Sequence, residues 1–251
     1  MTYLGFHAVF TLPLLLALAF WPPRPLSGNR AAAQALGLIV LIAFVYTTPW
    51  DNYLVYREVW GYPPDRVIAR IGYVPVEEYM FFVIQSLMTG LFTLRVLTRS
   101  GTPAPLGTSS TTPRWVGASF FIAVSVVGFV FLFASSERAL YMGLILSWAG
   151  PVLAGMWGLG GHWFWQRRRA WAISVAIPTL YLWWADRTAI ALEIWDISND
   201  TSFDIDPLGL PIEEAVFFLV TNLMVVQGML LFLPTSETDQ VASPAPAKAS
   251  A

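Results

Sequence analysis

The sequence contains no cysteine and few charged residues. The absence of cysteine from 251 residues excludes disulfide scaffolds, thiolate metal sites, iron–sulfur clusters and cysteine nucleophiles. Charged residues are 12% of the chain and hydrophobic residues 56%, whereas soluble domains carry roughly 25% charged residues. A net charge of −2 offers no basic surface for nucleic acid. These shortages exclude a soluble enzyme, a nucleic-acid-binding protein and a disordered protein, and they indicate an integral membrane protein.

Seven apolar stretches are long enough to cross a hydrocarbon core of about 30 Å, which takes roughly 20 helical residues. The first stretch follows no basic residue and precedes no small-residue cleavage site, so we interpret it as a helix rather than a signal peptide. The sixth stretch is interrupted by Pro178. The predicted spans are Leu4–Phe20, Ala31–Thr48, Pro75–Leu94, Trp115–Ala134, Ala139–Leu159, Trp171–Trp184 and Pro211–Leu233.

The seven spans place most basic residues on one side of the membrane and most acidic residues on the other. By the positive-inside rule the basic side is cytoplasmic. We therefore predict a multi-pass protein of the cell membrane with its N-terminus outside and its C-terminus in the cytoplasm. The basic side holds Arg24, Arg30, Arg95, Arg99, Arg114, Arg167, Arg168, Arg169 and Lys248, against Glu237 and Asp239.

One composite motif occurs twice in the chain. PWDNYLVYREVW (residues 49–60) precedes YVPVEEYMFF (73–82), and WADRTAIALEIW (184–195) precedes GLPIEEAVFF (209–218). The shared frame is D-x6-E-x-W, a loop, and then P-[VI]-E-E-x-x-F-F at the head of an apolar span. The matched positions are Asp51, Glu58 and Trp60 with Asp186, Glu193 and Trp195.

The duplication predicts the architecture, because four spans separate the two copies and so give them one orientation. We predict an all-α integral membrane protein of about seven transmembrane helices, built as two parallel three-helix repeats joined by an extra helix. The first repeat covers residues 1–98 and the second 139–234. Residues 99–138 form a linker and the connecting helix, and 235–251 form a disordered tail.

The acidic residues of the motif are candidates for chemistry. Proline followed by acids also suits an ordinary helix start, but here the acids run directly into Phe and Met, and ionisable groups at a span edge indicate a site inside the bundle. Helical spacing places the second glutamate of each pair on the more polar face. The candidate glutamates are Glu77, Glu78, Glu213 and Glu214.

Two aspartates and two further glutamates repeat the same spacing. Asp51 and Asp186 lie in apolar surroundings, which favours burial. Glu58 and Glu193 follow them by seven residues and should share their helical faces; they either support the site or belong to solvated helix ends. The expected lining of the pocket is aromatic: Trp50, Tyr53, Phe81, Phe82, Trp183, Trp184, Phe217 and Phe218.

Clustered carboxyl groups in an aromatic pocket have a particular chemical use. Loss of water and like-charged neighbours keep such a group protonated near neutral pH. It can then protonate an alkene, aromatic faces stabilise the resulting carbocation, and a second carboxylate can remove a proton. This pattern favours acid-triggered cyclisation of an isoprenoid within the membrane.

The doubled motifs on a seven-span chain resemble the membrane lycopene cyclases of the heterodimeric or fused type. The resemblance covers nearly the whole chain outside the linker and the tail, and it implies lycopene as substrate with γ-carotene or β-carotene as product. It implies acid–base roles for the four glutamates and support from Asp51 and Asp186. We expect no cofactor, because the cyclisation is redox-neutral and no G-x-G-x-x-G follows a strand, and we expect no metal site. Lipid is the implied surrounding, and other carotenoid enzymes are implied partners. One or two cyclised ends, and β or ε rings, stay open.

Two other functions remain as alternatives. A prenyltransferase could bind Mg²⁺ and a diphosphate at Asp196, Asp200 and Asp204, although a solvated acidic loop explains this run as well. A proton-coupled transporter would also suit parallel repeats with intramembrane acids. The only lysine is Lys248 in the tail, which excludes a retinal Schiff base in a helix.

Overall fold

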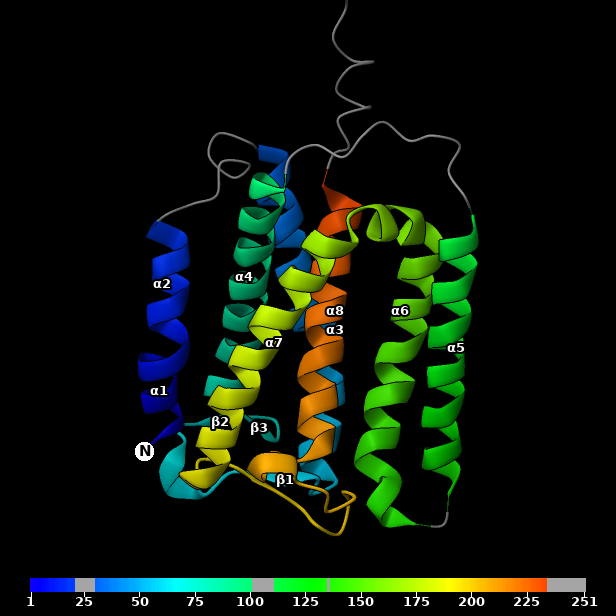
Figure 1. Ribbon diagram of the computed structural model, residues 1–251. Coiled ribbons are helices and arrows are strands. Elements are labelled where there is room, and N and C mark those ends of the chain that lie inside the picture. The colour runs from blue at the N-terminus through cyan, green and yellow to red at the C-terminus, as the bar shows by residue number, and fades with distance from the viewer. Residues whose placement is uncertain (21–29, 101–110, 135, 234–251) are drawn as a thin grey trace, which may run out of the picture.

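The structure is a computed structural model that describes residues 1–20, 30–100, 111–134 and 136–233. Long helices stand side by side, and short strands gather at the end of the bundle where the N-terminus lies (Figure 1). The predicted tail at 235–251 lies outside the described residues. The helices are α1 (Tyr3–Phe6), continued by a π-helical turn (His7–Thr11) into α2 (Leu12–Phe20), α3 (Arg30–Tyr56), α4 (Val76–Arg99), α5 (Thr112–Phe133), α6 (Leu140–Gln166), α7 (Arg168–Ala191) and α8 (Ile212–Phe232).

Most of these helices are long and apolar enough to cross a membrane, which confirms an all-α membrane protein. The six segments are Tyr3–Phe20, Arg30–Tyr56, Val76–Arg99, Thr112–Phe133, Glu137–Gln166 and Ile212–Phe232. The seventh long helix, α7, has 24 residues and contains Pro178. It is more polar than the others because it begins in the arginine run and includes Asp186 and Arg187, and it extends beyond both ends of the predicted span.

The proline of each PxEE motif ends an extended segment and starts a helix. Pro75 is the N-cap of α4 with φ −61° and ψ 149°, and Pro211 is the N-cap of α8 with φ −55° and ψ 138°. Proline has no N–H to leave unpaired, and its fixed φ suits the entry into a helix. Both glutamates of each motif therefore lie in a first helical turn, at the same end of the bundle.

The helices that carry Asp51 and Asp186 end two residues before the glutamate of the D-x6-E-x-W motif. The backbone of Glu58 and of Glu193 has a left-handed conformation, with φ 55° and 54°. The N–H of Glu58 donates to the carbonyl of Val55 at 3.1 Å, and the next N–H donates to Leu54 at 3.0 Å. Glu193 and Ile194 make the same two bonds at 2.9 and 3.1 Å. These are Schellman ends, which normally carry glycine at the left-handed position.

The prediction that Glu58 and Glu193 share a helical face with the aspartates is therefore wrong. The left-handed turn directs both glutamate side chains into exposed positions and turns the chain back toward the bundle. The residues that follow them, Val59 and Ile194, are fully buried. Burial of this following residue is the hydrophobic contact that accompanies a Schellman end.

Two small sheets join the loops at this end of the bundle. Strand β1 (Trp60–Gly61) pairs antiparallel with β4 (Asp196–Ile197), and β2 (Arg70–Ile71) pairs antiparallel with β3 (Val74–Pro75). The β1–β4 pair connects the two loops that lie between the D-x6-E-x-W and PxEE segments of each copy of the motif. Short 3₁₀ turns complete the loops at Pro64–Arg66, Glu137–Ala139 and Pro207–Gly209.

The helices α5 and α6 form a closely packed hairpin at the side of the bundle (Figure 1). Gly128 makes this approach possible, because a Cβ there would lie 2.4 Å from the backbone nitrogen of Ser147. Close contact through small residues is the usual way in which membrane helices associate. The α6 helix also packs on α8 and so connects the hairpin to the helices that carry the motifs.

Candidate active site

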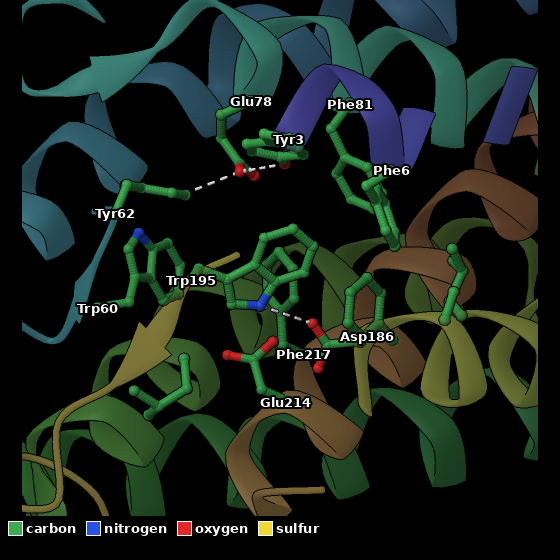
Figure 2. Close-up of a pocket in the computed structure, with 14 residues that line it drawn as sticks. Tyr3, Phe6, Trp60, Tyr62, Glu78, Phe81, Asp186, Trp195, Glu214 and Phe217 are labelled. Carbon is green, nitrogen blue, oxygen red and sulfur yellow. Dashed lines mark hydrogen bonds between the residues drawn. The ribbon is translucent and has the colours of Figure 1, made fainter. Parts of the chain in front are cut away.

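A pocket of about 460 Å³ lies where the two copies of the motif meet. Three carboxylic acids, two tyrosines and a majority of apolar side chains surround it (Figure 2). The lining residues are Tyr3, Phe6, Trp60, Tyr62, Glu78, Phe81, Leu182, Ala185, Asp186, Trp195, Ile197, Glu214, Phe217 and Phe218.

Glu78 enters the pocket from the first turn of α4 and is held by two phenols. Tyr3 donates to its Oε2 at 2.5 Å, and Tyr62 donates to the same oxygen at 2.9 Å. The two tyrosine rings stack with their centroids 6.0 Å apart. In Figure 2 the Glu78 carboxyl group lies between the two phenols, with Tyr62 on its left and Tyr3 on its right. Two donors on one oxygen favour the charged form of a carboxyl group.

Glu214 enters from the equivalent turn of α8 and has a single phenol partner. Tyr141, at the start of α6, donates to its Oε1 at 2.5 Å. Asp186 lies beside it on α7 and accepts from the indole Nε1 of Trp195 at 3.0 Å. The tryptophan of the second D-x6-E-x-W motif therefore orients the aspartate of the same motif.

Asp51 is the fourth acid of the cluster. It is 1% exposed and interacts electrostatically with Glu78 and Glu214. Its Oδ2 has no hydrogen-bond partner among the described residues. An unpaired buried oxygen is costly for a charged carboxylate but much less so for a neutral acid. Asp51 does not line the pocket but is near enough to interact with the pocket glutamates of both motifs.

The first glutamate of each pair has a different environment from the second. Glu77 accepts the backbone N–H of Ile68 at 2.8 Å, and Glu213 accepts that of Phe203 at 2.8 Å. Both glutamates are fully buried, and each holds the loop that precedes its own helix. The expected set of four glutamates thus divides into Glu78 and Glu214 in the pocket and two loop anchors beside it.

The predicted aromatic lining is only partly found. Phe81, Phe217 and Phe218 line the pocket, and Phe82 lines a neighbouring cavity. Trp50 stacks on Phe217 with centroids 5.6 Å apart.

Four of the predicted aromatic residues line neither the pocket nor the neighbouring cavity: Trp50, Tyr53, Trp183 and Trp184. Tyr53 is 42% exposed and Trp184 is 54% exposed, so both lie on the outer surface of their helices. Trp183 donates to the backbone oxygen of Ala215 at 2.9 Å and braces α7 against α8 instead of lining the pocket.

The phenols of the site were not predicted from the sequence. Tyr62 lies two residues after Trp60, the last residue of the first D-x6-E-x-W segment. Its closeness in sequence to this segment was the available signal. Tyr3 and Tyr141 are distant in sequence from the carboxylates they contact, but each begins a Tyr-x-Gly segment near the start of its repeat (residues 3–5 and 141–143), and this match was the available signal. The two motif tryptophans, Trp60 and Trp195, were matched in the duplication but not assigned to the pocket.

The electrostatics of the pocket are those of buried acids and neutral phenols. Among the described residues that line it, none is basic. Burial raises the pKa of the Tyr62 phenol well above its ordinary value of 10.0, and the charges of Glu78 and Asp51 raise it further. Tyr62 is therefore a neutral donor near pH 7. The described part of the chain contains no group of three or more His, Asp or Glu side chains that could hold a metal ion.

Known proteins resemble this chain over nearly its whole length. A lycopene beta-cyclase of Halobacterium salinarum is 41% identical over 233 residues, which cover 92% of this chain and 95% of that protein. The chain belongs to the lycopene cyclase family. No protein-family model matches this family member, and no solved structure matches it.

Fungal proteins of the lycopene cyclase family also match, over part of their length. A bifunctional lycopene cyclase/phytoene synthase of Phycomyces blakesleeanus is 37% identical over 247 residues, which are 90% of this chain and 38% of that protein. The protein of the same name from Neurospora crassa is 36% identical over 245 residues, or 92% of this chain and 39% of that protein. This lycopene cyclase family member therefore corresponds to one part of the fungal proteins.

Proposed function

We propose that this protein is a lycopene β-cyclase that converts the acyclic ψ end groups of lycopene into β-rings, giving γ-carotene and β-carotene. One observation carries the proposal for the site: acids from both copies of the motif surround one aromatic pocket. Glu78 belongs to the first copy, and Asp186 and Glu214 belong to the second. Asp51 joins them from the side of the first copy.

The proposed reaction transfers one proton in and one proton out. A protonated carboxyl group delivers H⁺ to C2 of the ψ end, which leaves a tertiary cation at C1. The C5–C6 double bond attacks C1, so the C1–C6 bond forms and the cation moves to C5. Loss of the C6 proton to a carboxylate then makes the ring double bond. Nothing is oxidised or reduced, so the proposal requires no redox cofactor.

Hydrogen bonding suggests which glutamate acts as the acid. Glu78 accepts two phenol donors, whereas Glu214 accepts one. Because donors stabilise a carboxylate, we assign Glu78 as the base that removes the C6 proton and Glu214 as the acid. Asp51 and Asp186 support the acid by placing further carboxyl groups nearby, where like charges oppose ionisation.

Aromatic rings around the pocket suit a carbocation. Trp60, Trp195, Phe81 and Phe217 all line it, and a cation over an aromatic face gains about 0.5–2 kcal/mol. Because most of the lining is apolar, the pocket offers few hydrogen-bond partners to water, which would otherwise capture the cation. The rings therefore protect the intermediate between proton addition and proton loss.

The domain organisation is part of the proposal. We infer two units at residues 1–98 and 139–234, joined through 99–138, that share one pocket rather than forming one each. Equal Schellman ends at Glu58 and Glu193 and equal loop anchors at Glu77 and Glu213 support the pairing of the units. One pocket per chain means that the two ends of lycopene are cyclised in turn.

The orientation follows from the charges. We infer that the N-terminus is outside, the C-terminus is cytoplasmic and the pocket lies near the outer face, because Arg167, Arg168 and Arg169 belong to the cytoplasmic side. The natural chain has no cysteine, so introduced single cysteines can test it. A membrane-impermeant thiol reagent should label Asp204→Cys in intact cells and Arg168→Cys only after lysis. The reverse pattern would overturn the assignment.

Lycopene and lipid are the proposed contacts of the protein in the membrane. Other carotenoid enzymes are proposed partners only because a substrate this apolar passes between enzymes within the bilayer. The prenyltransferase alternative gains no support, since Asp196, Asp200 and Asp204 lie exposed on the loop before α8. The transporter alternative gains none from a carboxyl pocket walled mainly by aromatic and aliphatic side chains.

Expression in a lycopene-accumulating bacterium tests the function. The wild-type protein should yield monocyclic and dicyclic products with the same mass as lycopene and with β-rings on chromatographic analysis. Glu78→Gln and Glu214→Gln should each reduce cyclisation by about 10²–10⁴-fold, the usual contribution of a general acid or base. If both variants cyclise lycopene at the normal rate, the site assignment is wrong.

A further inference from the structure

A second cavity of about 660 Å³ adjoins the carboxyl pocket and lies deeper in the bundle. Helices α3, α4, α6 and α8 each contribute to its walls. Phe81 and Phe217 line both spaces, so the two cavities meet at this pair of rings. The second cavity therefore begins where the pocket for the reacting group ends.

The second cavity is elongated along the helices. On α3 its lining extends from Ile39 to Thr47, and on α8 from Phe217 to Val225. Eight residues at a rise of about 1.5 Å each give a length of about 12 Å. This is roughly two-fifths of a hydrocarbon core of about 30 Å. A molecule that filled both cavities would be long and narrow.

The walls of the second cavity are mostly apolar, with Thr47, Gln85, Ser86 and Thr221 as polar members, and include flat aromatic faces. Tyr46 stacks on Trp148 with centroids 5.2 Å apart and planes 15° apart. Trp148 stacks in turn on Trp50 at 4.5 Å and 19°. The amide of Gln85 is engaged by Asn222 at 2.9 Å, so it does not require a polar ligand. Such walls fit a planar hydrocarbon chain better than a polar molecule.

One side of the second cavity reaches the outer surface of the bundle. Ile42 is 44% exposed and Tyr46 is 39% exposed, and both line it. Nearer the carboxyl pocket, the bundle is closed by bonds from α3 to α6. Tyr46 donates to the carbonyl of Trp148 at 3.0 Å, and Trp50 donates to that of Leu144 at 3.3 Å. The opening therefore lies at membrane depth, away from the carboxylates.

We propose that the second cavity is the binding channel for the polyene chain of the substrate, open sideways to the lipid between α3 and α6. The inference rests on the proposed function and deepens it. The ψ end occupies the carboxyl pocket, the adjoining polyene lies along the channel, and the rest of the chain extends into the bilayer. Only one end fits at a time, so a cyclised end leaves by the same opening before the second end enters.

Bulky substitutions in the channel test the proposal. Thr221→Phe on α8 and Val152→Phe on α6 each place a ring in the channel without altering a carboxyl group. The measurement is the rate of ring formation on lycopene and on a short isoprenoid of about ten carbons, which carries one ψ end and does not extend beyond the carboxyl pocket. The ratio of the two rates should fall by about tenfold or more, as expected when a pocket loses room for part of its ligand.

Leu219→Phe is the matched control, because Leu219 lies on the same helix as Thr221 and is 37% exposed; its ratio should equal that of the wild type. Thermal unfolding of each variant in detergent shows whether the fold is retained. If both substrates are cyclised normally by the channel variants, or if both rates fall equally, the channel assignment is wrong. If the wild-type protein cyclises neither substrate, the proposed function itself fails.

Discussion

The two glutamates of each PxEE motif act differently because consecutive residues of a helix point about 100° apart. At the start of α4, Glu78 faces the pocket and Glu77 faces back toward the loop, where it accepts the N–H of Ile68. At the start of α8, Glu214 and Glu213 repeat this division. The buried acid beside each pocket glutamate is therefore an anchor for the loop that precedes its helix.

Glu77→Ala should lower stability and leave the chemistry largely intact. The change removes the acceptor of the Ile68 N–H, and a buried group left without its partner costs about 1–3 kcal/mol. We expect a lower Tm in detergent and a cyclisation rate per folded molecule within a few fold of the wild type. Glu78→Gln should show the opposite pattern, with near-normal Tm and lost activity. Loss of chemistry without loss of stability in Glu77→Ala would contradict the anchor role.

Tyr62→Phe should change the pH dependence of cyclisation. The high pKa of the buried phenol keeps Tyr62 protonated, so it donates to Glu78 throughout the neutral range. Without this donor the Glu78 carboxylate is less stabilised and takes up a proton at higher pH. The acidic limb of the rate profile should therefore move to higher pH by up to about one unit.

Tyr79→Phe is the control for this measurement. The Tyr79 hydroxyl donates to the backbone oxygen of Ile71 at 2.9 Å and makes no contact with the pocket acids among the described bonds. Its pH profile should match that of the wild type. An unchanged profile in Tyr62→Phe would remove Tyr62 from the positioning of Glu78.

At the scale of elements, the ends of α3 and α7 explain why the motif contains tryptophan two residues after its glutamate. The left-handed residue reverses the chain, the next residue is buried, and the tryptophan then points back over the pocket. Trp195 reaches Asp186 in this way. Trp60, after the equivalent turn, lines the same pocket.

Glycine in place of Glu58 or Glu193 should stabilise the protein. A left-handed conformation costs an L-residue about 1–2 kcal/mol, and the greater freedom of glycine in the unfolded chain offsets about 0.4–1 kcal/mol of that. Each change should therefore raise the stability by about 0.5–1 kcal/mol. A Tm series in detergent measures the effect.

Leu192→Gly is the control, because Leu192 precedes Glu193 and has a negative φ of −94°. It should be neutral or destabilising. A fall in Tm for both Glu58→Gly and Glu193→Gly would show that the glutamate side chains contribute more than the strain they carry.

The starts of helices could be predicted from the sequence better than their ends. Pro75 and Pro211 mark starts through the fixed φ of proline. The predicted sixth span ends at Trp184, two residues before the polar Asp186 and Arg187. The helix continues to Ala191, because its inner side, with Ala185, Asp186 and Ala189, is buried against the bundle. A hydropathy pattern does not distinguish a polar residue facing a pocket from one facing water.

At the scale of the whole molecule, the site exists only where the two copies of the motif meet. The sequence predicted that the acids of both motif copies lie at one membrane end, because four spans separate the two copies. It could not predict that Tyr3 reaches Glu78 across 75 residues of chain or that Tyr141 reaches Glu214 across 73. Those contacts depend on how the helices pack against one another, which no local pattern records.

A site that needs both copies from one chain makes a clear prediction for mixed expression. A cell that produces Glu78→Gln and Glu214→Gln chains together should form no more β-ring product than either variant alone. Every chain then lacks one of the two carboxylates of its own pocket, and a neighbouring molecule does not replace it. Chromatography of the pigments measures the outcome.

Co-expression of each variant with the wild-type chain is the control, and it should give β-rings at the level set by the wild-type protein. This control also detects a variant that inhibits the activity of another chain in the same cell, because such inhibition would mimic the expected result. Recovery of cyclisation in the mixed variants would mean that the pocket forms between chains. The pairing of β1 with β4 within one chain argues against this, because it joins the loops beside the pocket before any second molecule is present.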